Sequence, residues 1–353
     1  MQDIVEHFRD HVRAAARDQR ALRIRGGGTK DWYGQRLEGD VLDTCGHAGV
    51  IDYEPTELVI TARCGTPLAD VEALLARQGQ MLAFEPPHFG AGATLGGAIA
   101  AGLSGPRRAS SGAARDFVLG CTLLDGKGDV LRFGGQVMKN VAGYDVSRLL
   151  AGSLGTLGLL LDVSVKVLPR APREATLVFD GVAEVDAIRR LNEWGGRPLP
   201  VSASCWHDGV LALRLSGANA AVDAAIRTLG GDVMPDCARF WAGLREQRHG
   251  FFDGDMPLWR LSVPSTVGAI VLGSPQLIEW GGAQRWLRAP GDAATAQRIR
   301  ATVSAAGGHA TLFRGGDKGV GVFQPLAPAV ARIHARLKAG FDPAGIFNPG
   351  RMV

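Results

Sequence analysis

The stretch RGGGTKDWYG at residues 25–34 begins at the last residue of a predicted strand, Leu22–Arg25. Its glycine triplet, Gly26–Gly28, exposes backbone N–H groups and removes the Cβ atoms that would hold a ligand at a distance. Such a loop can wrap a diphosphate, and it can equally be a flexible turn. It is not a Walker A loop, because Lys30 is followed by Asp31 rather than by Ser or Thr.

Two further glycine-rich segments lie downstream. GAGATLGG at Gly90–Gly97 lacks the Rossmann fingerprint, which would need glycine at position 95, where this chain has Leu. That segment could also be a helix packed through its small residues. The second segment, KNVAGYDVSRLLAGSLGTLG at 139–158, places glycines and hydroxyl groups in a turn before a predicted strand, Leu159–Leu168. There the backbone could approach a flat or phosphorylated ligand.

The composition excludes several classes of protein. Glycine makes up 49 of the 353 residues, about twice its usual share of ~7%, yet there is no collagen period. The chain is 46% hydrophobic and 21% charged, which excludes wholesale disorder. Its net charge is +4, and no basic run has the length of a nucleic-acid patch, so we expect no nucleic-acid partner.

The cysteines and the apolar runs predict a cytoplasmic protein. The five cysteines are far apart and form no CxxC motif, so we expect free thiols and no iron–sulfur cluster on this chain. The charged N-terminus lacks the apolar core of a secretory signal. Two long uncharged runs, Phe89–Pro106 and Leu261–Ile278, are interrupted by glycines and prolines, and so we expect no membrane span.

The order of the predicted elements indicates an α+β fold. The first part begins with an amphipathic helix over residues 1–21 and includes a small-residue helix over Thr94–Leu103 and a β-hairpin over residues 117–133. The pattern changes at Pro169–Pro172. Beyond that point, repeated β-α-β-β-α patterning suggests a ferredoxin-like second domain.

The order and spacing of four segments resemble one family of flavoproteins. The segments are RGGGTKDWYG, ATLGGAIAAGLSGPRR, MKNVAGYDVSRLLAGSLGTLG and FDPAGIFNPGRM. They resemble the FAD-binding subunits of bacterial glycolate oxidases, within the vanillyl-alcohol-oxidase/PCMH superfamily. The resemblance implies a PCMH-type FAD-binding domain of two α/β subdomains at 1–170 and a ferredoxin-like cap domain at 171–325. It also implies that a C-terminal segment, 326–353, returns to the FAD domain.

The resemblance also implies where FAD is bound. Arg25–Lys30 match the first diphosphate loop. Ala93–Gly97, with Ala100 and Gly102, match a second phosphate and ribityl contact region. Ser104 and Gly105 lie where the family runs beside the flavin, Gly152–Leu159 match a turn near the adenine, and Asn348 matches a residue that returns to the flavin ring. The implied FAD-binding residues are Arg25, Gly26, Gly27, Gly28, Thr29, Lys30, Ala93, Thr94, Gly96, Gly97, Ala100, Gly102, Ser104, Gly105, Gly152, Gly155, Thr156, Gly158, Leu159 and Asn348.

The sequence departs from related flavoproteins in two ways. Members that bind flavin covalently carry His after the glycine triplet, where this chain has Thr29, and we therefore expect non-covalent FAD. Related 2-hydroxy-acid dehydrogenases carry an HxGDGN-type metal segment in the second domain. The comparable segment here, His309–Asp317, lacks the paired histidines. We therefore expect no metal site.

Oxidation of a 2-hydroxy acid needs a base for the hydroxyl, a cation for the carboxylate and a flavin next to the α-carbon. Arg260 and Arg285 could clamp a carboxylate, because a guanidinium is a planar fork, or they could be structural. Lys139 could pair with a phosphate or with a neighbouring Asp. His88 could lie at the flavin edge or in a surface loop. The sequence identifies no catalytic base.

The resemblance implies an FAD subunit of a membrane-associated complex that oxidises glycolate to glyoxylate. In that complex this chain would carry a second flavin. A homologous partner would hold the substrate-oxidising FAD and a metal, and an iron–sulfur subunit would take the electrons onward. The chain would then lie in the cytoplasm or at the periphery of the inner membrane. Two alternatives remain open: a self-sufficient flavin oxidoreductase for glycolate or D-lactate, and a scaffold subunit without flavin.

Overall fold

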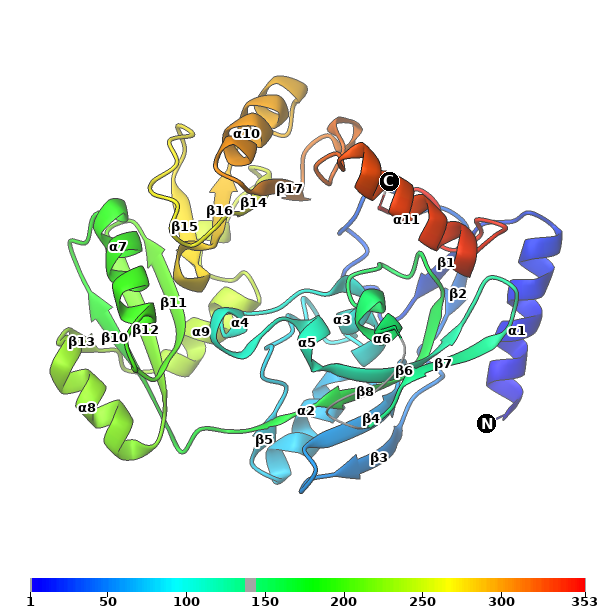
Figure 1. Cartoon of the computed structure of the whole chain (residues 1–353), viewed down its shortest axis with the longest axis horizontal. Coiled ribbons are helices and arrows are strands. Elements are labelled where there is room, and N and C mark those ends of the chain that lie inside the picture. Colours follow the sequence, from blue (N-terminus) through cyan, green and yellow to red (C-terminus); the bar gives the residue numbers. More distant parts are fainter. Residues whose placement is uncertain (1, 137–143, 353) are drawn as a thin grey trace. The chain divides into compact units, whose positions relative to one another are not determined.

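The computed structural model describes residues 2–136 and 144–352, and the chain divides into two compact units. The chain enters the second unit twice, and its C-terminal segment returns to the first (Figure 1). The first unit comprises Met1–Ser104, Gly112–Pro169 and Pro325–Val353, and the second comprises Gly105–Ser111 and Arg170–Gln324. The sequence analysis had placed the limits after residues 170 and 325, and it did not separate residues 105–111 from the FAD domain. Lys139 lies outside the described residues.

An antiparallel five-stranded sheet is the centre of the first unit, in the order β3-β4-β8-β6-β7. All seven residues of β6 are buried, which explains why its sequence, VLGCTLL, is a continuous apolar run without alternation. Helices α2 and α3 contribute Leu68, Val71, Leu95 and Ile99 to the core of this sheet. The bounds are β3 Val50–Glu54, β4 Val59–Arg63, α2 Leu68–Arg77, α3 Leu95–Ala101, β6 Val118–Leu124, β7 Val130–Gly134 and β8 Leu159–Lys166.

A smaller layer holds the chain's two ends together. Strands β1 (Leu22–Arg25) and β2 (Asp40–Asp43) pair in parallel, and Leu22 also bridges to Phe347 in the C-terminal segment. Helix α1 (Gln2–Arg17) packs its apolar stripe, which includes Phe8 and Val12, against this layer. In Figure 1 the red C-terminal part accordingly lies beside β1 and β2.

The second unit is built on an eight-stranded sheet, ordered β13-β10-β12-β11-β15-β16-β14-β17. Its first half has the β-α-β-β-α-β order and strand arrangement of a ferredoxin-like domain, as the sequence predicted. Its second half extends the same sheet, which the sequence analysis did not predict. The bounds are β10 Arg173–Phe179, α7 Glu184–Gly195, β11 Val201–His207, β12 Val210–Gly217, α8 Asn219–Leu229, β13 Asp232–Val233, β14 Leu258–Ser262, β15 Gln276–Glu279, β16 Gln284–Arg288, α10 Ala293–Ala305 and β17 His309–Arg314.

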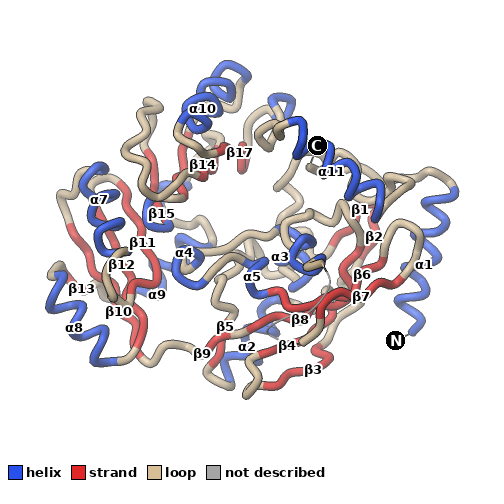
Figure 2. The backbone as a smooth tube through the Cα atoms, in the orientation of Figure 1, coloured by secondary structure: helices blue, strands red, loops and turns tan. Residues whose placement is uncertain are grey.

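The two faces of this sheet differ in polarity. One face packs against α7, α8 and α10, and Figure 2 shows these helices in blue beside the red strands. Trp259 and Leu261 of β14 point to this helical face. Because side chains alternate along a strand, Arg260 between them points to the opposite face, together with its cross-strand partners Trp286 and Thr311. The sheet therefore has a polar face that carries a candidate for carboxylate binding.

The remaining elements are short apart from α11. They are β5 Gln80–Met81, α4 Arg108–Ser111, α5 Ala114–Phe117, α6 Val146–Leu150, β9 Leu168–Pro169, α9 Cys237–Arg245, η1 Gly250–Phe252, η2 Trp280–Gly282, η3 Lys318–Val320 and α11 Pro328–Phe341. Over residues 2–136 and 144–352, the structure contains no helix with the length and apolar character needed to cross a bilayer.

Candidate cofactor-binding site

The first two glycine-rich loops contact each other through their backbones. A Cβ atom added at Gly27 would lie 1.5 Å from the carbonyl oxygen of Gly92. One added at Gly26 would lie 2.5 Å from Oγ1 of Thr94. The glycines are therefore needed for the approach of one loop to the other, whether or not a ligand is present.

The first loop presents backbone donors that the protein itself does not use. Within the described part of the chain, the N–H groups of Gly27, Gly28 and Thr29 donate no backbone hydrogen bond. Gly28 has a φ of +72°, in the left-handed region that glycine adopts without strain. All three residues are only partly buried. Successive N–H groups left available in this way fit an anion such as a diphosphate.

Basic side chains surround this loop. Arg23 and Arg25 both form ion pairs with Oδ2 of Asp31, and the distance from Arg25 Nε is 3.0 Å. The Lys30 ammonium donates to the carbonyl oxygen of His88 over 3.1 Å, which ties the end of the first loop to the entry of the second. The loop thus has a positive environment, which favours a negatively charged ligand.

The ring of His88 itself faces α2. Its Nε2 lies 3.0 Å from Oε2 of Glu72, and the side chain is mostly buried. This contact gives His88 a structural neighbour on α2. The hypothesis that His88 lies at the flavin edge stays a prediction.

Helix α3 joins the second loop to the third turn. Thr94 caps the helix, because its Oγ1 accepts from the N–H of Gly97 over 3.1 Å. A Cβ at Gly96 would lie 2.5 Å from Cβ of Cys64, so this glycine permits the helix to pack on β4 and its following turn. Gly102 ends the helix with a φ of +62°, and a Cβ there would lie 2.7 Å from Cα of Gly152.

The third turn is fixed to α3 by its backbone. The N–H of Gly152 donates to Ile99 O over 3.0 Å, and that of Leu154 donates to Ala100 O over 2.8 Å. At the end of the turn, a Cβ on Gly158 would lie 2.7 Å from Leu124 O, and the next residue, Leu159, is buried in the core. The structure therefore brings the three predicted glycine segments together around one short helix.

Asn348 connects this third turn to the strand before the first loop. Its Nδ2 donates to Leu154 O over 2.6 Å, and its Oδ1 accepts from the N–H of Ile24 over 2.9 Å. The side chain is buried, and a Cβ at Gly155 would lie 2.7 Å from Nδ2. Both polar atoms of the amide are thus engaged by backbone groups. The contact of Asn348 with the flavin ring stays a prediction, whereas the clamp between two loops is observed.

Lys338 of α11 holds the same region. Its ammonium donates to Thr156 O over 2.7 Å, to Phe347 O over 2.8 Å and to the carboxylate of Asp342 over 2.5 Å. Asp342 in turn accepts from the N–H groups of Ile346 and Phe347. The C-terminal segment thus determines the position of the turn near Thr156. The sequence analysis missed Lys338, although it is one of few lysines in the chain.

The two residues expected beside the flavin belong to different units. Ser104 ends a stretch of the first unit, and its Oγ accepts from the N–H of Ala114 over 3.0 Å. Gly105 begins the first stretch of the second unit, and its carbonyl oxygen accepts from Trp280 Nε1 over 3.1 Å. Trp280 has a φ of +55°, which is rare for a bulky residue.

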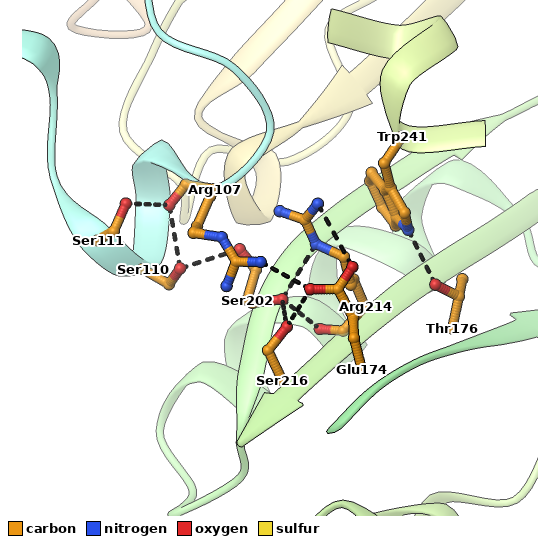
Figure 3. A network of polar contacts seen from close by, with 9 residues as sticks. All are labelled: Arg107, Ser110, Ser111, Glu174, Thr176, Ser202, Arg214, Ser216 and Trp241. Carbon is orange, nitrogen blue, oxygen red and sulfur yellow. Dashed lines mark hydrogen bonds and ion pairs between the residues drawn. The ribbon is translucent and has the colours of Figure 1, made fainter. Parts of the chain in front are cut away.

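A polar network holds the segment after Gly105 to the second unit's sheet (Figure 3). Arg107 donates to Oε2 of Glu174 over 2.7 Å, and Ser216 donates to the same oxygen over 2.7 Å. Ser110 donates to Ser202 O over 2.9 Å. The buried Arg214 donates to Ser202 Oγ over 3.1 Å and lies over the ring of a nearby tryptophan. Residues 105–111 therefore have well-defined partners on β10, β11 and β12.

The polar face of the second unit's sheet carries a positive group of side chains. Arg260 is half-buried and lies over the ring of Phe313, with its Cζ 5.4 Å from the centroid. The pKa of His309 is lowered by burial and further by the charges of Arg260 and Arg108. Two guanidinium groups thus act on one imidazole, and this arrangement would suit a carboxylate.

Arg285, the other sequence candidate for a carboxylate clamp, is structural. It lies on the helical face of the sheet and is fully buried. Its guanidinium donates to the carbonyl oxygens of Gly268 over 2.8 Å and Val267 over 2.5 Å, and burial lowers its pKa. Of the two roles that the sequence left open for Arg285, the structure therefore supports the structural one.

Metal-binding side chains are scattered in the described part of the chain, where no group of three or more His, Cys, Asp or Glu residues has the geometry to hold an ion. His7 and His11 lie four residues apart on α1 with ring centroids separated by 4.3 Å, an HxxxH spacing that the sequence analysis failed to recognise. Two exposed imidazoles are fewer ligands than a structural zinc site uses.

Comparisons with known proteins find a family model that matches most of the first unit's N-terminal stretch and relatives that match the whole chain. The sequence model of the family described as FAD binding domain matches residues 4–134. The chain is 47% identical over 350 residues to glycolate oxidase subunit GlcE of Escherichia coli (strain K12), covering 99% of this chain and 97% of that protein. It is 32% identical over 129 residues to glycolate oxidase subunit GlcD of Bacillus subtilis (strain 168), which is 36% of this chain and 27% of that protein.

The chain is also similar to more distant relatives and to solved structures. A D-lactate dehydrogenase of Archaeoglobus fulgidus is 31% identical over 182 residues, which is 51% of this chain and 40% of that protein. Among solved structures, alkyldihydroxyacetonephosphate synthase matches with a TM-score of 0.67 at 15% identity, over 97% of this chain and 73% of that one. At that identity the match shows the fold alone. Together these findings confirm the predicted fold class and FAD as the cofactor, whereas the contacts of individual residues with FAD stay predictions.

Proposed function

Because the chain belongs to the family of the glycolate oxidase subunit GlcE, we propose that it is an FAD-binding subunit of a complex that oxidises glycolate to glyoxylate. The observation that carries this proposal is the 47% identity over 99% of the chain. FAD, when bound, supplies an acceptor for two electrons. The chain's own residues would bind its diphosphate through the N–H groups of Gly27, Gly28 and Thr29 and through the basic side chains around them. Since Thr29 cannot form the histidyl linkage, FAD would be held without a covalent bond.

This flavin would be the second one of the complex rather than the main site of substrate oxidation. The segment His309–Asp317 lacks the paired histidines of related hydroxy-acid dehydrogenases. The likeness to D-lactate dehydrogenase spans about half of this chain, whereas the likeness to GlcE spans nearly all of it. A homologous subunit of the GlcD type, with FAD and a metal, would oxidise glycolate. A separate iron–sulfur subunit would carry electrons onward, because the cysteines here are dispersed and have no CxxC spacing.

A second function is favoured by one observation, the two guanidinium groups of Arg108 and Arg260, whose charges both act on His309. They would bind the carboxylate of a 2-hydroxy acid if this chain oxidised substrate by itself. That reading predicts that Arg260→Gln raises KM for glycolate about tenfold or more, because a charge-assisted bidentate contact is lost. Arg248→Gln, an exposed arginine of the same unit, is the matched control. An unchanged KM contradicts the self-sufficient reading.

The test of the proposed function compares the purified chain with the reconstituted complex under anaerobic conditions. We expect the isolated chain to carry one FAD, which acid precipitation releases into the supernatant. We expect glycolate to reduce this flavin only when the GlcD-type subunit is present. Rapid reduction of the isolated chain by glycolate contradicts the proposal and supports self-sufficiency. A colourless chain that takes up no FAD supports a scaffold role instead.

A further inference from the structure

The C-terminal tail, residues 342–352, carries an arginine back to the first glycine loop. The N–H of Gln35 donates to Arg351 O over 2.8 Å, and the N–H of Arg36 donates to Gly350 O over 3.2 Å. These two bonds anchor the tail to the stretch that follows the loop. Arg351 is thus fixed by its backbone beside residues 30–36, although more than 300 residues separate it from them in the sequence.

The guanidinium of Arg351 is buried and only partly satisfied. The residue is 7% exposed, and its Nη2 donates to Lys30 O over 3.1 Å. Its Nη1 is buried without a hydrogen-bond partner among the residues that the structure describes. A Cβ at Gly34 would lie 2.9 Å from Nε, so the glycine in RGGGTKDWYG makes room for this side chain.

The surroundings of Arg351 hold more positive than negative charge. Oδ2 of Asp31 already accepts from both Arg23 and Arg25. Arg23 Nε is a second buried donor without a partner in the described part of the chain. Burial lowers the pKa of Arg351, and the charge of Arg23 lowers it further, against the opposing effect of Asp31. A buried cation with an unused donor is costly unless an anion compensates it.

We infer that Nη1 of Arg351 is kept for the diphosphate of FAD, so that a C-terminal residue completes the anion site of the glycine loop. The inference rests on the proposed function in one respect, that this chain binds FAD. It adds a residue that neither the glycine motifs nor the match over residues 4–134 includes. The N–H groups of Gly27, Gly28 and Thr29 would hold the same group, which carries two negative charges.

The experiment measures the affinity of apo-protein for ligands that differ in phosphate content. FAD binding is followed by flavin fluorescence, and ADP, AMP and riboflavin are measured by calorimetry. For Arg351→Gln we expect the affinities for FAD and ADP to fall about tenfold or more, because charge-assisted hydrogen bonds are the strong ones. We expect riboflavin binding to stay as in the wild type. The FAD affinity of Arg351→Gln should fall less steeply with rising salt than that of the wild type.

Two variants separate a ligand contact from a structural role. Arg351→Lys keeps the charge and should recover part of the lost ADP affinity. Arg36→Gln removes an exposed arginine of the same segment, which pairs with Glu38, and should change no affinity. If Arg351 were purely structural, its replacement by Gln would instead lower the melting temperature of the apo-protein. It would also weaken the binding of riboflavin as much as the binding of ADP.

The outcomes that overturn the inference differ from those that overturn the proposed function. If the wild type binds FAD and Arg351→Gln binds FAD and ADP equally well, the orphan donor faces a buried water only, and the inference fails alone. Equal losses for riboflavin and ADP also overturn it. A wild-type chain that binds neither FAD nor ADP overturns both the FAD role and this inference.

Discussion

At the scale of single residues, the glycines of the predicted FAD site differ in what surrounds them. Gly27 and Gly96 allow one part of the chain to touch another, since an added Cβ would meet Gly92 O at 1.5 Å or Cβ of Cys64 at 2.5 Å. Gly97 differs, because it is partly exposed and an added Cβ would meet only Oγ1 of Thr94, at 3.1 Å. Exchange of Gly27 would therefore damage the loops themselves, whereas exchange of Gly97 probes the space outside the chain.

We predict that Gly97→Ala folds and binds FAD more weakly. In the apo-protein, the gain in helix propensity is worth up to about 1 kcal/mol and offsets the tight contact with Thr94. The added methyl group would occupy space expected for the phosphate or ribityl chain. Urea unfolding of the apo-protein and FAD titration check this. Gly340→Ala in α11, where a Cβ meets nothing within 4 Å, is the control and should be slightly stabilising without a change in affinity. Unaltered FAD affinity in Gly97→Ala would remove this residue from the site.

We also predict that Asn348→Asp weakens the clamp between Ile24 and Leu154. The carboxylate still accepts from the N–H of Ile24 but cannot donate to Leu154 O, so the free energy of unfolding should fall by about 1–3 kcal/mol. Asp tolerates the left-handed backbone that Asn348 adopts, with a φ of +41°. Chemical denaturation measures the loss, with the exposed Asn219→Asp as control. A variant as stable as the wild type would show that the bond to Leu154 contributes nothing.

Sequence reasoning located these residues but not the reason for each. A motif shows only that a side chain is absent at Gly27 or Gly96. Either a bound ligand or a neighbouring backbone could require that absence, and the sequence does not distinguish the two. Asn348 was predicted at the flavin ring because it follows a family motif, whereas the structure shows both amide groups bonded to backbone. Arg351 and Lys338 were missed, since their partners are near only after the chain has folded.

At the scale of elements, residues 105–111 show how a short segment is assigned to a unit by side chains. Arg107, Glu174 and Ser216 share one carboxylate oxygen, and Ser110 bonds to Ser202 O (Figure 3). None of these partners is near in sequence. The order of hydrophobic and polar residues therefore predicted the helices and strands on either side but not the membership of this segment.

We predict that Glu174→Gln loosens residues 105–111. A neutral amide keeps one acceptor but loses the charge that attracts Arg107, and a partly exposed pair of this kind is worth about 1 kcal/mol or less. Hydrogen exchange of a peptide covering 105–111 should speed up several-fold. Glu193→Gln on α7, which breaks an exposed pair with Arg189, should leave that peptide unchanged. Unaltered exchange in Glu174→Gln would mean that the serine contacts suffice to hold the segment.

The hairpin of β15 and β16 shows why part of the second sheet was missed. All four residues of β15, QLIE, are buried, so the strand shows no alternation of polar and apolar positions. The buried Glu279 accepts from Trp286 Nε1 over 2.6 Å and from Gln284 Nε2 over 3.0 Å. When only the sequence is read, polar residues that are buried and hydrogen-bonded inside the fold look like surface residues. The ferredoxin-like half followed the ordinary pattern and was predicted.

At the scale of the whole molecule, the pKa values of several histidines are shifted in the same direction. Burial lowers the pKa values of His47, His207, His249 and His309 below the ordinary value of the imidazole. Neighbouring cations add to the effect at His47 and His309. The unfolded chain therefore binds protons at a pH where the folded chain still does not.

We predict that the protein loses stability as the pH falls from 7.5 to 6.0. The sign follows from linkage: where the unfolded state binds more protons, the free energy of unfolding rises with pH and falls on acidification. Urea unfolding at several pH values, followed by tryptophan fluorescence, measures the slope. His207→Gln should make the slope smaller. A stability that is constant or higher at pH 6.0 would contradict the prediction.

The return of the tail to the glycine loops has a consequence for how the protein is made. On the ribosome, the loops at 26–29 and 90–97 and the turn at 152–158 emerge well before Lys338, Asn348 and Arg351. At ~5–20 residues per second, the delay between the turn and the tail is roughly 10–40 s. During that time the larger stretch of the second unit, Arg170–Gln324, is synthesised, and the predicted FAD site lacks the contacts of Lys338, Asn348 and Arg351. Flavin is then bound only by the nearly finished polypeptide. Errors in folding Arg170–Gln324 would therefore reduce cofactor content, although none of the predicted FAD contacts lies in that stretch.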